Sequence, residues 1–593
     1  MNVSEQLLQI LRDEGVRHIF GVAGDALNPL VSALGAQDED AEDRILWIKM
    51  KHEGNASFAA FAQGELGGNL GVCASTVGPG ALHLVNGLYN ARKERSPVLA
   101  ITGQVPVEHL GTEYHQEVDL TKVFEDVCTY QAVIRSPEEA PRVILRALRI
   151  ALNERTVCRV ELPADIAWMK AANQDFVHRV FRTRSVVTPH ADVLERAVEL
   201  LDGAESVGIL AGAGCRDARD DVVALAQHLR APITHTVRAA DVFDHDAPNV
   251  VGLTGLIGNP SGYTAVMESD VLLMLGTDFP YTPYLPYDKP VIQVDVRAEN
   301  IGNRVPVALG IHGDVGVVAR HLAGACEARS EGDFADRLNA EFLDWKREQC
   351  ERSDGERDFK VVHPQIVART LSDVASDDAI FVVDTGTSAI WSTNFMNFRG
   401  DRRVIGSFSH GSMAVGLPAA IGAQLQYPGR EVWALVGDGA FNMSLHDLST
   451  AAEYDLPIRI VVLNNAELGF VKIEMEEAGL APNYDALAID NIDFCAYARL
   501  CGGEGVSVDE VQGIRAALDQ AKASTVPFVI DAHVTGGALS LPPRVEMHQA
   551  KNFAISKLRE IAGALKGDRR QWENIKAELD AVIDLQRGGG GGE

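Results

Sequence analysis

The sequence lacks the features that mark membrane, secreted and metal-cluster proteins. No apolar run approaches the ~18 residues of a membrane-spanning helix, and the first residues, MNVSEQLLQILRDEG, have no basic region of the kind that begins a secretory signal. The eight cysteines include no C-x-x-C pair, and several lie in apolar runs such as LGVCAS. We therefore expect buried thiols in a cytoplasmic protein, and neither a zinc site nor a disulfide framework.

Basic residues are scarce relative to acidic ones. The 593 residues include 54 Lys and Arg against 83 Asp and Glu, which gives a formal net charge of −29. This balance disfavours nonspecific attraction to DNA, RNA or anionic lipid, so no nucleic-acid partner is expected. The net charge does not identify the substrate, because a local positive site can exist on an acidic protein.

Apolar runs typical of buried strands alternate with helix-period segments along most of the chain. Such strands, each followed by a helix, are typical of parallel sheets covered on both faces. We therefore predict an α/β protein of three doubly wound domains with mainly parallel sheets, at residues 1–175, 190–328 and 360–545, followed by a helical C-terminal tail at 546–593. The predicted strands are HIFGVAG, RILWIKM, LGVCAS, PVLAITG and CRVELPAD, then SVGILAGAG, APITHTV, DVLLMLGT and PVIQVDV, then AIFVVDTG, EVWALVGDG, IRIVVLNN and PFVIDAHV.

One segment of the third domain carries polar residues at two successive strand ends. The run EVWALV ends in Gly437–Gly439, and the next predicted strand ends in Asn-Asn, the second being Asn465, 27 residues after Asp438. Parallel strands bring these residues to one edge of the sheet, where open α/β sheets bind ligands. Carboxylate and amide oxygens suit Mg²⁺, which completes its shell with phosphates. Glycines let a diphosphate approach closely, and a helix expected to begin near Ser444 can point its N-terminus toward it. Gly-Asp-Gly alone would also fit a tight turn.

This segment resembles the thiamine-diphosphate motif of 2-keto-acid decarboxylases, oxidases and acetolactate synthases. The resemblance extends over Val3–Leu565 and implies a pyrimidine domain, a central domain and a diphosphate domain, in that order. In KHEGNASFAAFAQG, Glu53 matches the acid that drives tautomerisation of the cofactor's aminopyrimidine. Met413 matches the bulky residue that holds the cofactor in a V shape, and the Glu467 carbonyl matches a third protein ligand to Mg²⁺ beside Asp438 and Asn465. Without the family, Glu53 would be a charge partner at a helix start and Met413 a core residue.

The central domain resembles that of pyruvate oxidase and of the pyruvate dehydrogenase that reduces quinone. The similar segments are VGLTGLIGNPSG, MLGTDFPYTPYLP and IQVDVRAENIG. The glycine turn AGAGCRD is not a complete G-x-G-x-x-G, so the prediction of bound FAD depends on this resemblance. The residues that the resemblance places against FAD are Thr254, Gly255, Gly276, Thr277, Phe279 and Asp295.

Two further segments bear on the reaction. In LGFVKIEMEEAG, Phe470 and Glu474 correspond to residues that cover the reactive carbon of the cofactor, and the tryptophan-rich segment of acetolactate synthases is absent. Glu474 alone would also fit a solvated helix face. In GTEYHQEVDL the family's usual Phe-Gln-Glu is replaced by His115-Gln116-Glu117. Gln116 can still donate toward a substrate carboxylate, whereas His115 either hydrogen-bonds a polar substrate or phosphate or only fills the volume.

The resemblance implies oxidative decarboxylation of pyruvate or a similar small 2-keto acid through a thiamine-bound enamine. Electrons would pass to FAD and then to quinone, and acetate would be released. The alternatives are an oxygen-using pyruvate oxidase that forms acetyl phosphate and an acetolactate-synthase-like carboligase with structural FAD. A noncatalytic flavoprotein is disfavoured by the intact set of Glu53, Asp438 and Asn465. Since Glu53 and Asp438 would contact opposite ends of one cofactor, the family builds the site between two chains. We expect a homodimer at least, and a tetramer by resemblance.

The C-terminal tail has an amphipathic pattern. Apolar residues recur at three to four residue spacing and would lie on one helix face. Packing against the same subunit is one interpretation, and contact with a partner or with the inner face of the cell membrane is the other. The polar face lacks the Lys and Arg excess that attracts anionic lipid. The apolar residues are Trp572, Ile575, Leu579, Val582 and Ile583.

Overall fold

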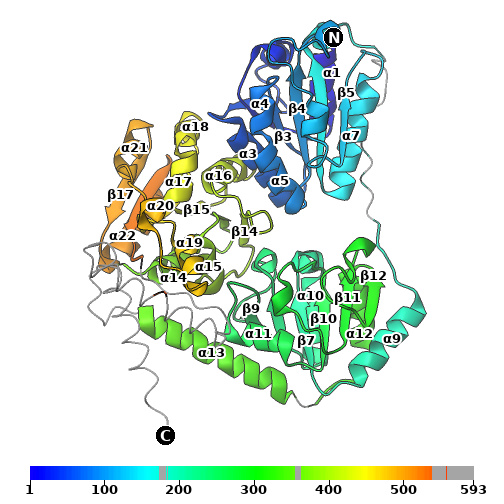
Figure 1. Cartoon of the computed structure of the whole chain (residues 1–593), viewed down its shortest axis with the longest axis vertical. Coiled ribbons are helices and arrows are strands. Elements are labelled where there is room, and N and C mark those ends of the chain that lie inside the picture. Colours follow the sequence, from blue (N-terminus) through cyan, green and yellow to red (C-terminus); the bar gives the residue numbers. More distant parts are fainter. Residues whose placement is uncertain are drawn as a thin grey trace.

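Three six-stranded parallel sheets form the framework of the computed structural model (Figure 1). The structure describes residues 1–172, 180, 182, 185–330, 332–353, 362–536 and 556. Consecutive strand residues such as Ile19 and Phe20 are fully buried in different apolar clusters, because alternate side chains point to opposite faces of a sheet. Helices therefore cover both faces, and the predicted α/β class with three parallel sheets is confirmed.

The first sheet has the strand order β2-β1-β3-β4-β6-β5. Its helix α1 begins with a capping box, in which Asn2 and Glu5 bond each other's backbone N–H groups. The strands are β1 (His18–Gly21), β2 (Leu46–Lys49), β3 (Gly71–Ser75), β4 (Val98–Gln104), β5 (Tyr130–Val133) and β6 (Val157–Pro163). The helices are α1 (Val3–Asp13), α2 (Asn28–Gly35), α3 (Glu53–Gly67), α4 (Pro79–His83), α5 (Val85–Lys93), α6 (Leu120–Val123), α7 (Ala140–Glu154) and α8 (Ala164–Trp168).

The third sheet, ordered β14-β13-β15-β16-β18-β17, repeats the order of the first. When the strands are numbered within each domain, both the first and the third sheet have the order 2-1-3-4-6-5. The strands are β13 (Ile380–Val383), β14 (Arg403–Gly406), β15 (Val432–Gly437), β16 (Arg459–Asn464), β17 (Glu504–Val508) and β18 (Phe528–His533). The helices are α14 (Pro364–Val374), α15 (Thr387–Phe395), α16 (Gly416–Gln426), α17 (Asp438–Ser444), α18 (Leu448–Glu453), α19 (Gly469–Glu477), α20 (Tyr484–Leu487), α21 (Phe494–Leu500) and α22 (Val511–Ala523).

The central sheet is ordered β12-β11-β10-β7-β8-β9. Read from the other edge and numbered within its domain, it is 3-2-1-4-5-6, the order of dinucleotide-binding sheets, with the switch point between β7 and β10. The strands are β7 (Val207–Ala211), β8 (Ile233–His235), β9 (Val250–Leu253), β10 (Val271–Leu275), β11 (Val291–Asp295) and β12 (Leu309–His312). The helices are α9 (Ala191–Asp202), α10 (Arg219–His228), α11 (Pro260–Met267) and α12 (Val315–Ala325).

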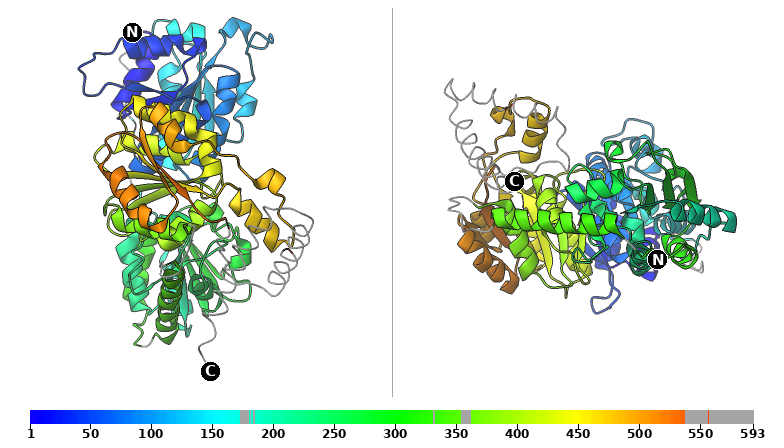
Figure 2. Two further views of the ribbon diagram at one scale, coloured as in Figure 1. Left: turned by 90° about the vertical axis from the view of Figure 1, so that its left-hand side faces the viewer. Right: turned by 90° about the horizontal axis from the view of Figure 1, so that it is seen from below.

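The segment between the second and third predicted domains contains a long helix, α13 (Asp333–Ser353), which runs across the base of the molecule from the central to the third domain (Figures 1 and 2). No helix of the described residues is long and apolar enough to cross a bilayer. Six of the eight cysteines are buried and all eight are free thiols, as expected. The predicted domain limits stay predictions, and the amphipathic pattern of the tail lies outside the described residues.

Candidate active site

The two polar strand ends of the third domain lie side by side. Strand β15 ends at Gly437 and pairs in parallel with β16, with Gly437 opposite Leu463. Asp438 and Asn465 therefore follow neighbouring strands at the same edge of the sheet. The expectation of a helix beginning near Ser444 is wrong, because α17 begins at Asp438 and ends at Ser444. The Asp438 carboxylate accepts the Gly439 N–H at 2.9 Å, which places the side chain against the first turn of this helix.

Asp438 is a buried carboxylate, 2% exposed, that is held by nitrogen donors. Its Oδ2 accepts a hydrogen bond from Asn491 Nδ2 at 2.7 Å, and the Ala466 N–H also donates to it. Burial raises the pKa of Asp438, and these donors oppose the effect. Asp438 makes no ion pair with any described Lys, Arg or His, so its charge is compensated by hydrogen bonds alone.

Asn491 is a residue of this site that the sequence reasoning missed. Its Nδ2 donates to Asp438 and, at 2.9 Å, to Asn464 Oδ1, while its Oδ1 accepts from Asn442 Nδ2 at 2.7 Å. One amide thus joins the ends of β15 and β16. Asn491 lies in a loop after α20, where no motif marks it, and the only available signal was the run of Asp and Asn in AIDNID.

The predicted ligands Asn465 and Glu467 lie in a tight turn. Ala466 between them has φ 56°, in the left-handed region. Asn465 Oδ1 accepts from the Glu467 N–H at 3.3 Å, and the Glu467 carbonyl accepts from Gly469 at 3.0 Å. The Glu467 carboxylate points elsewhere, since it lies 3.4 Å from Nζ of buried Lys472.

The donor set fits a hard divalent cation with a diphosphate. Asp438 offers a carboxylate and Asn465 an amide oxygen, and oxygen ligands of this kind suit Mg²⁺. A cation beside Asp438 would supply the positive charge that this buried carboxylate does not have among the described residues. Gly437 faces open space, where an added Cβ would meet no atom within 4 Å, so the turn leaves room for a ligand.

Met413 lies in a constrained loop next to the Gly-Asp-Gly turn. Its Cε is 3.5 Å from the position that a Cβ on Gly439 would occupy. The loop passes through Ala414, with φ 77°, and is held at its end by Asp384, whose Oδ2 accepts the Gly416 N–H at 2.8 Å. Burial raises the pKa of Asp384 to about 6, while backbone N–H groups lower it.

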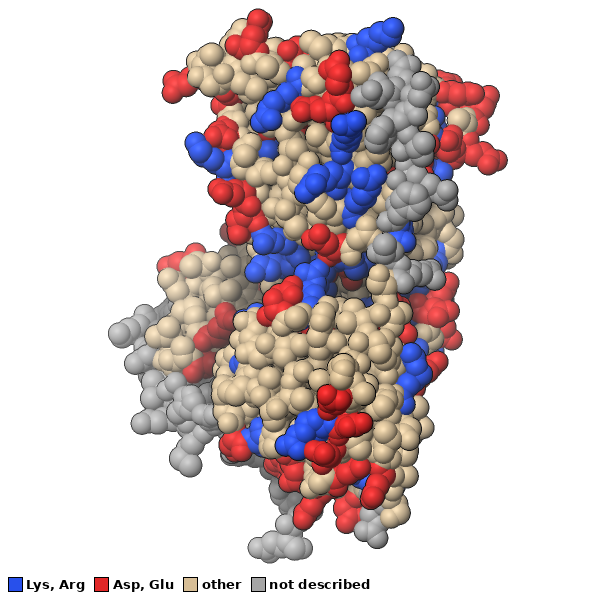
Figure 3. Space-filling model, turned by 90° about the vertical axis from the view of Figure 1, so that its right-hand side faces the viewer, with Lys and Arg blue, Asp and Glu red and all other residues tan. Residues whose placement is uncertain are grey.

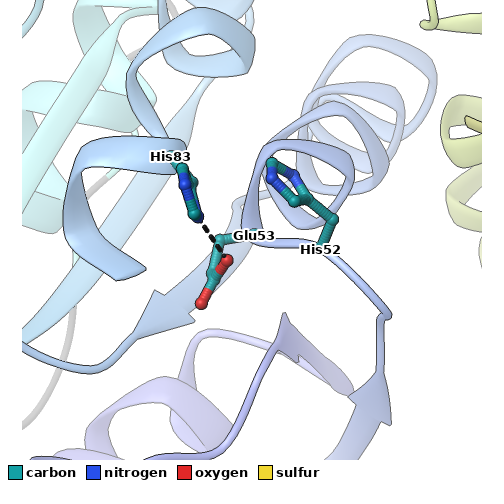
Figure 4. A group of neighbouring side chains, drawn as sticks. All are labelled: His52, Glu53 and His83. Carbon is teal, nitrogen blue, oxygen red and sulfur yellow. Dashed lines mark hydrogen bonds and ion pairs between the residues drawn. The ribbon is translucent and has the colours of Figure 1, made fainter. Parts of the chain in front are cut away.

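In the first domain, Glu53 stands between two histidines (Figure 4). Glu53 begins α3 and is 8% exposed, with His52 as the N-cap that accepts the Gly54 N–H at 3.0 Å. His83 Nδ1 lies 2.9 Å from Glu53 Oε2, and the two histidine rings are 4.5 Å apart. A Cβ on Gly80 would come within 2.9 Å of Glu53 Oε1, so glycine there leaves space for the carboxylate.

Gln116 and His115 differ in their surroundings. Gln116 has φ 64°, and its carbonyl lies 2.5 Å from the position of a Cβ on Gly78, in the loop that leads to Gly80. The backbone of Gln116 therefore adjoins the loop beside Glu53. His115 is exposed and makes no hydrogen bond, ion pair or ring contact with a described residue.

Glu53 and Asp438 are not joined by a hydrogen bond or a shared partner among the described residues. The first and third domains are connected through other residues: a Cβ on Gly422 of α16 would lie 2.2 Å from the Ala59 carbonyl of α3, so these helices pack closely. Buried Asp447 accepts the Lys51 N–H at 2.7 Å. Within one chain, the two predicted halves of the site are thus held by a helix interface of small residues.

A cleft of about 1190 Å³ opens at the switch point of the central sheet. Gly276, with φ 58°, touches Gly214 there, and a Cβ on Gly276 would lie 2.7 Å from the Gly214 Cα. Of the predicted flavin residues, four line the cleft and two do not. Gly276, Thr277, Phe279 and Asp295 line it. Thr254 is 1% exposed with no partner for its hydroxyl, and Gly255 packs behind Phe279. The glycine contact and the strand order suit a dinucleotide.

Helix α19 connects this cleft with the third domain. Burial raises the pKa of Tyr281, a residue of the cleft wall, and the nearby Glu474 carboxylate raises it further. Asn394 of α15 donates to the Ile257 carbonyl at 2.8 Å, in the loop after Thr254. Phe470 packs against the apolar core of the third domain. Helix α19 therefore begins next to Asn465, where a Cβ on Gly469 would lie 2.7 Å from Nδ2, and carries Glu474 near Tyr281 of the cleft wall.

Family models of thiamine pyrophosphate enzymes match the chain in all three of its domains. Residues 1–123 match the N-terminal TPP binding domain of thiamine pyrophosphate enzymes, residues 194–322 the central domain, and residues 384–532 the C-terminal TPP binding domain. In structure, the chain is similar to the thiamine diphosphate-dependent 4-hydroxybenzoylformate decarboxylase of Rhodococcus jostii RHA1, with a TM-score of 0.78 and 23% identity, over 90% of this chain and 99% of that one.

Similar sequences span nearly the full length. The chain is 34% identical over 579 residues to YdaP of Bacillus subtilis (strain 168), whose name places it among thiamine pyrophosphate-containing proteins, covering 98% of this chain and 97% of that protein. It is 29% identical to a Lactiplantibacillus plantarum pyruvate oxidase, over 89% and 88% of the two chains, and 28% identical to a Corynebacterium glutamicum acetolactate synthase large subunit, over 99% and 95%. With all three of its domains matched in order, the chain belongs to the thiamine pyrophosphate enzyme family.

Proposed function

We propose that the protein catalyses oxidative decarboxylation of pyruvate or a similar small 2-keto acid, passing electrons to FAD and then to quinone, with acetate as product. The observation that carries this proposal is the position of α19, because the helix begins at Gly469 next to Asn465 and carries Glu474 near Tyr281 of the central cleft. A cleft of dinucleotide type next to the thiamine site is what electron transfer between the two cofactors requires.

The residues of the third domain would hold the diphosphate end of the cofactor. Asp438 and Asn465, with the Glu467 carbonyl, would bind Mg²⁺, and Gly437 and the other glycine of the turn would admit the diphosphate. Met413, beside that turn, would support the bent conformation of the cofactor. Thiamine diphosphate, when bound, supplies an electron-accepting ring for the carbanion left by loss of CO₂.

Glu53 would control the proton at N1′ of the aminopyrimidine. Its burial and its short contact with His83 favour a carboxyl group that exchanges a proton at one fixed position. Gln116 would orient the substrate carboxylate, and Phe470 and Glu474 would cover the reacting carbon. His115, exposed in a single chain, would meet either substrate or a second subunit.

A second copy of the chain would complete the site. No described contact brings Glu53 to Asp438 within one chain, and the helix pair α3 and α16 already occupies the interface between their domains. We propose a homodimer as the minimum, with Glu53 from one chain facing Asp438 of the other, and a tetramer as the assembly.

A carboligase is the second candidate, because the chain is 28% identical over 99% of its length to an acetolactate synthase large subunit. Anaerobic addition of pyruvate to the purified protein separates the two functions. Bleaching of the flavin with release of acetate supports the oxidative reaction, whereas acetolactate formation with an unchanged flavin spectrum supports the carboligase. Reoxidation by ubiquinone analogues or by oxygen, and acetate or acetyl phosphate as product, then identify the acceptor.

A further inference from the structure

The cleft between the first and central domains gathers basic side chains on an otherwise acidic protein. Figure 3 shows Lys and Arg side chains in the hollow between these domains. The cleft is lined from both sides, by the ends of α5 and α7 in the first domain and by the β7, β10 and β11 ends in the central domain. A ligand bound against the central sheet would therefore also meet the first domain.

Most of these cations already have acidic partners. Arg238 Nε lies 2.6 Å from Glu94 Oε2, and Arg304 Nε lies 3.2 Å from Asp278 Oδ1. Arg297 is tied to the first domain through the carbonyl of Glu154. Such pairs fix the walls of the cleft but leave little free positive charge for a ligand.

Arg95 is different, because its guanidinium makes no hydrogen bond or ion pair with a described residue. It lines the cleft immediately after α5, and its backbone has φ 57°, a left-handed conformation that arginine rarely adopts. Burial and the charges of Arg297 and Arg238 lower the pKa of Arg95, while Asp295 and Asp278 raise it. The positive charge of the Arg95 guanidinium is therefore only partly compensated, and it lies in the cleft between the first and central domains.

We infer that Arg95 is a phosphate-binding residue of this cleft, contributed by the first domain to the nucleotide held by the central domain. A planar guanidinium donates two parallel N–H bonds to a phosphate, and a phosphate would supply the anion that the protein does not place there. The identity of the ligand as the diphosphate of FAD rests on the proposed function. The other source of the same chemistry is free inorganic phosphate.

Titrations of the flavin-free protein test this role. FAD, ADP, riboflavin and inorganic phosphate are titrated by calorimetry into the wild type, Arg95→Gln and Arg95→Lys, with Arg92→Gln as the matched control. Arg92 lines the same cleft but is paired with Asp126 at 3.7 Å. We expect Arg95→Gln to weaken FAD and ADP by about 10-fold or more, the loss of one charged hydrogen-bonding group. Riboflavin should be unaffected, Arg95→Lys intermediate, and Arg92→Gln within about 3-fold of wild type.

Each other result is decisive. Unchanged FAD and ADP affinity in Arg95→Gln would overturn the inference. Phosphate binding that depends on Arg95, with unchanged FAD affinity, would overturn the nucleotide assignment in favour of free phosphate. Arg95-dependent binding of ADP by a wild type that takes up no FAD would uphold the inference and remove FAD from the proposed function. Equal thermal midpoints of the two Gln variants exclude a folding defect as the cause.

Discussion

The variant Glu53→Gln removes proton exchange at residue 53 but leaves the size of the side chain nearly unchanged. Glutamine has nearly the volume of glutamate and keeps an oxygen that can accept from His83, so the contact of 2.9 Å can persist. The change from a charged to a neutral acceptor weakens that bond by about 1 kcal/mol. Because the substitution preserves the volume and one hydrogen-bond acceptor of this buried side chain, the fold and the cofactor affinity should change little. Loss of a positioned acid–base group, by contrast, should lower turnover by at least about 10²-fold, or ~3 kcal/mol in barrier height.

Two measurements on the same preparation check this prediction. Calorimetry gives the affinity for thiamine diphosphate with Mg²⁺, and reduction of an artificial electron acceptor by pyruvate gives turnover. His83→Gln is the control, because it removes the histidine but leaves the carboxylate, and it should cost much less than Glu53→Gln. Turnover of Glu53→Gln near that of the wild type would remove Glu53 from the mechanism, and equal losses in both variants would assign the effect to the pair.

Other perturbations address the remaining sites. Asp438→Ala should lose Mg²⁺ and thiamine diphosphate together but keep FAD, as measured by calorimetry and flavin absorbance, because the two proposed sites lie in different domains. Asp384 has a folded pKa of about 6 against an ordinary value of 3.8, so it favours the folded state at low pH and that contribution is lost as the pH rises through about 6. In Asp384→Asn the thermal midpoint should therefore change less between about pH 4 and 7 than in the wild type; parallel curves would contradict this. The tail is tested by liposome flotation of the full chain and of one ending at Leu565, with and without pyruvate, and we expect weak, salt-sensitive binding only of the full chain. Equal flotation of both would mean that the tail is not the anchor.

The sequence predicted every strand in the interior of the three sheets but missed most of the strands at the sheet edges. Every central strand was marked by a near-continuous apolar run, because it is buried on both faces. The five strands that were not predicted, β5, β9, β12, β14 and β17, all lie at sheet edges. Burial is partial along β5, β12 and β17, whereas β9 is fully buried and β14 nearly so, and both of these are only four residues long. Edge strands need no continuous apolar run, so periodicity alone cannot identify them. Helix α13, between the second and third predicted domains, was missed because many of its residues are charged.

The site residues divide in a similar way. Asp438 and Asn465 were predictable because each directly follows a buried strand, and strand order then fixes their proximity. Asn491 reaches the same place from a loop, through hydrogen bonds that no spacing rule encodes. His83 likewise meets Glu53 only because α4 folds over the start of α3.

The charge distribution explains how an acidic protein can present a basic cleft. Glu94 of the first domain forms an ion pair with Arg238 of the central domain. It also accepts a hydrogen bond from the Ser409 N–H of the third domain. Asp241 of the central domain similarly pairs with Arg403 of the third at 2.9 Å. Removing one partner of such a buried pair leaves an uncompensated charge, which is costly. The ion pairs that neutralise most of the cleft thus also hold the three domains around it. The positive charge left for a ligand is confined to the few cations, Arg95 among them, that form no ion pair with another described residue.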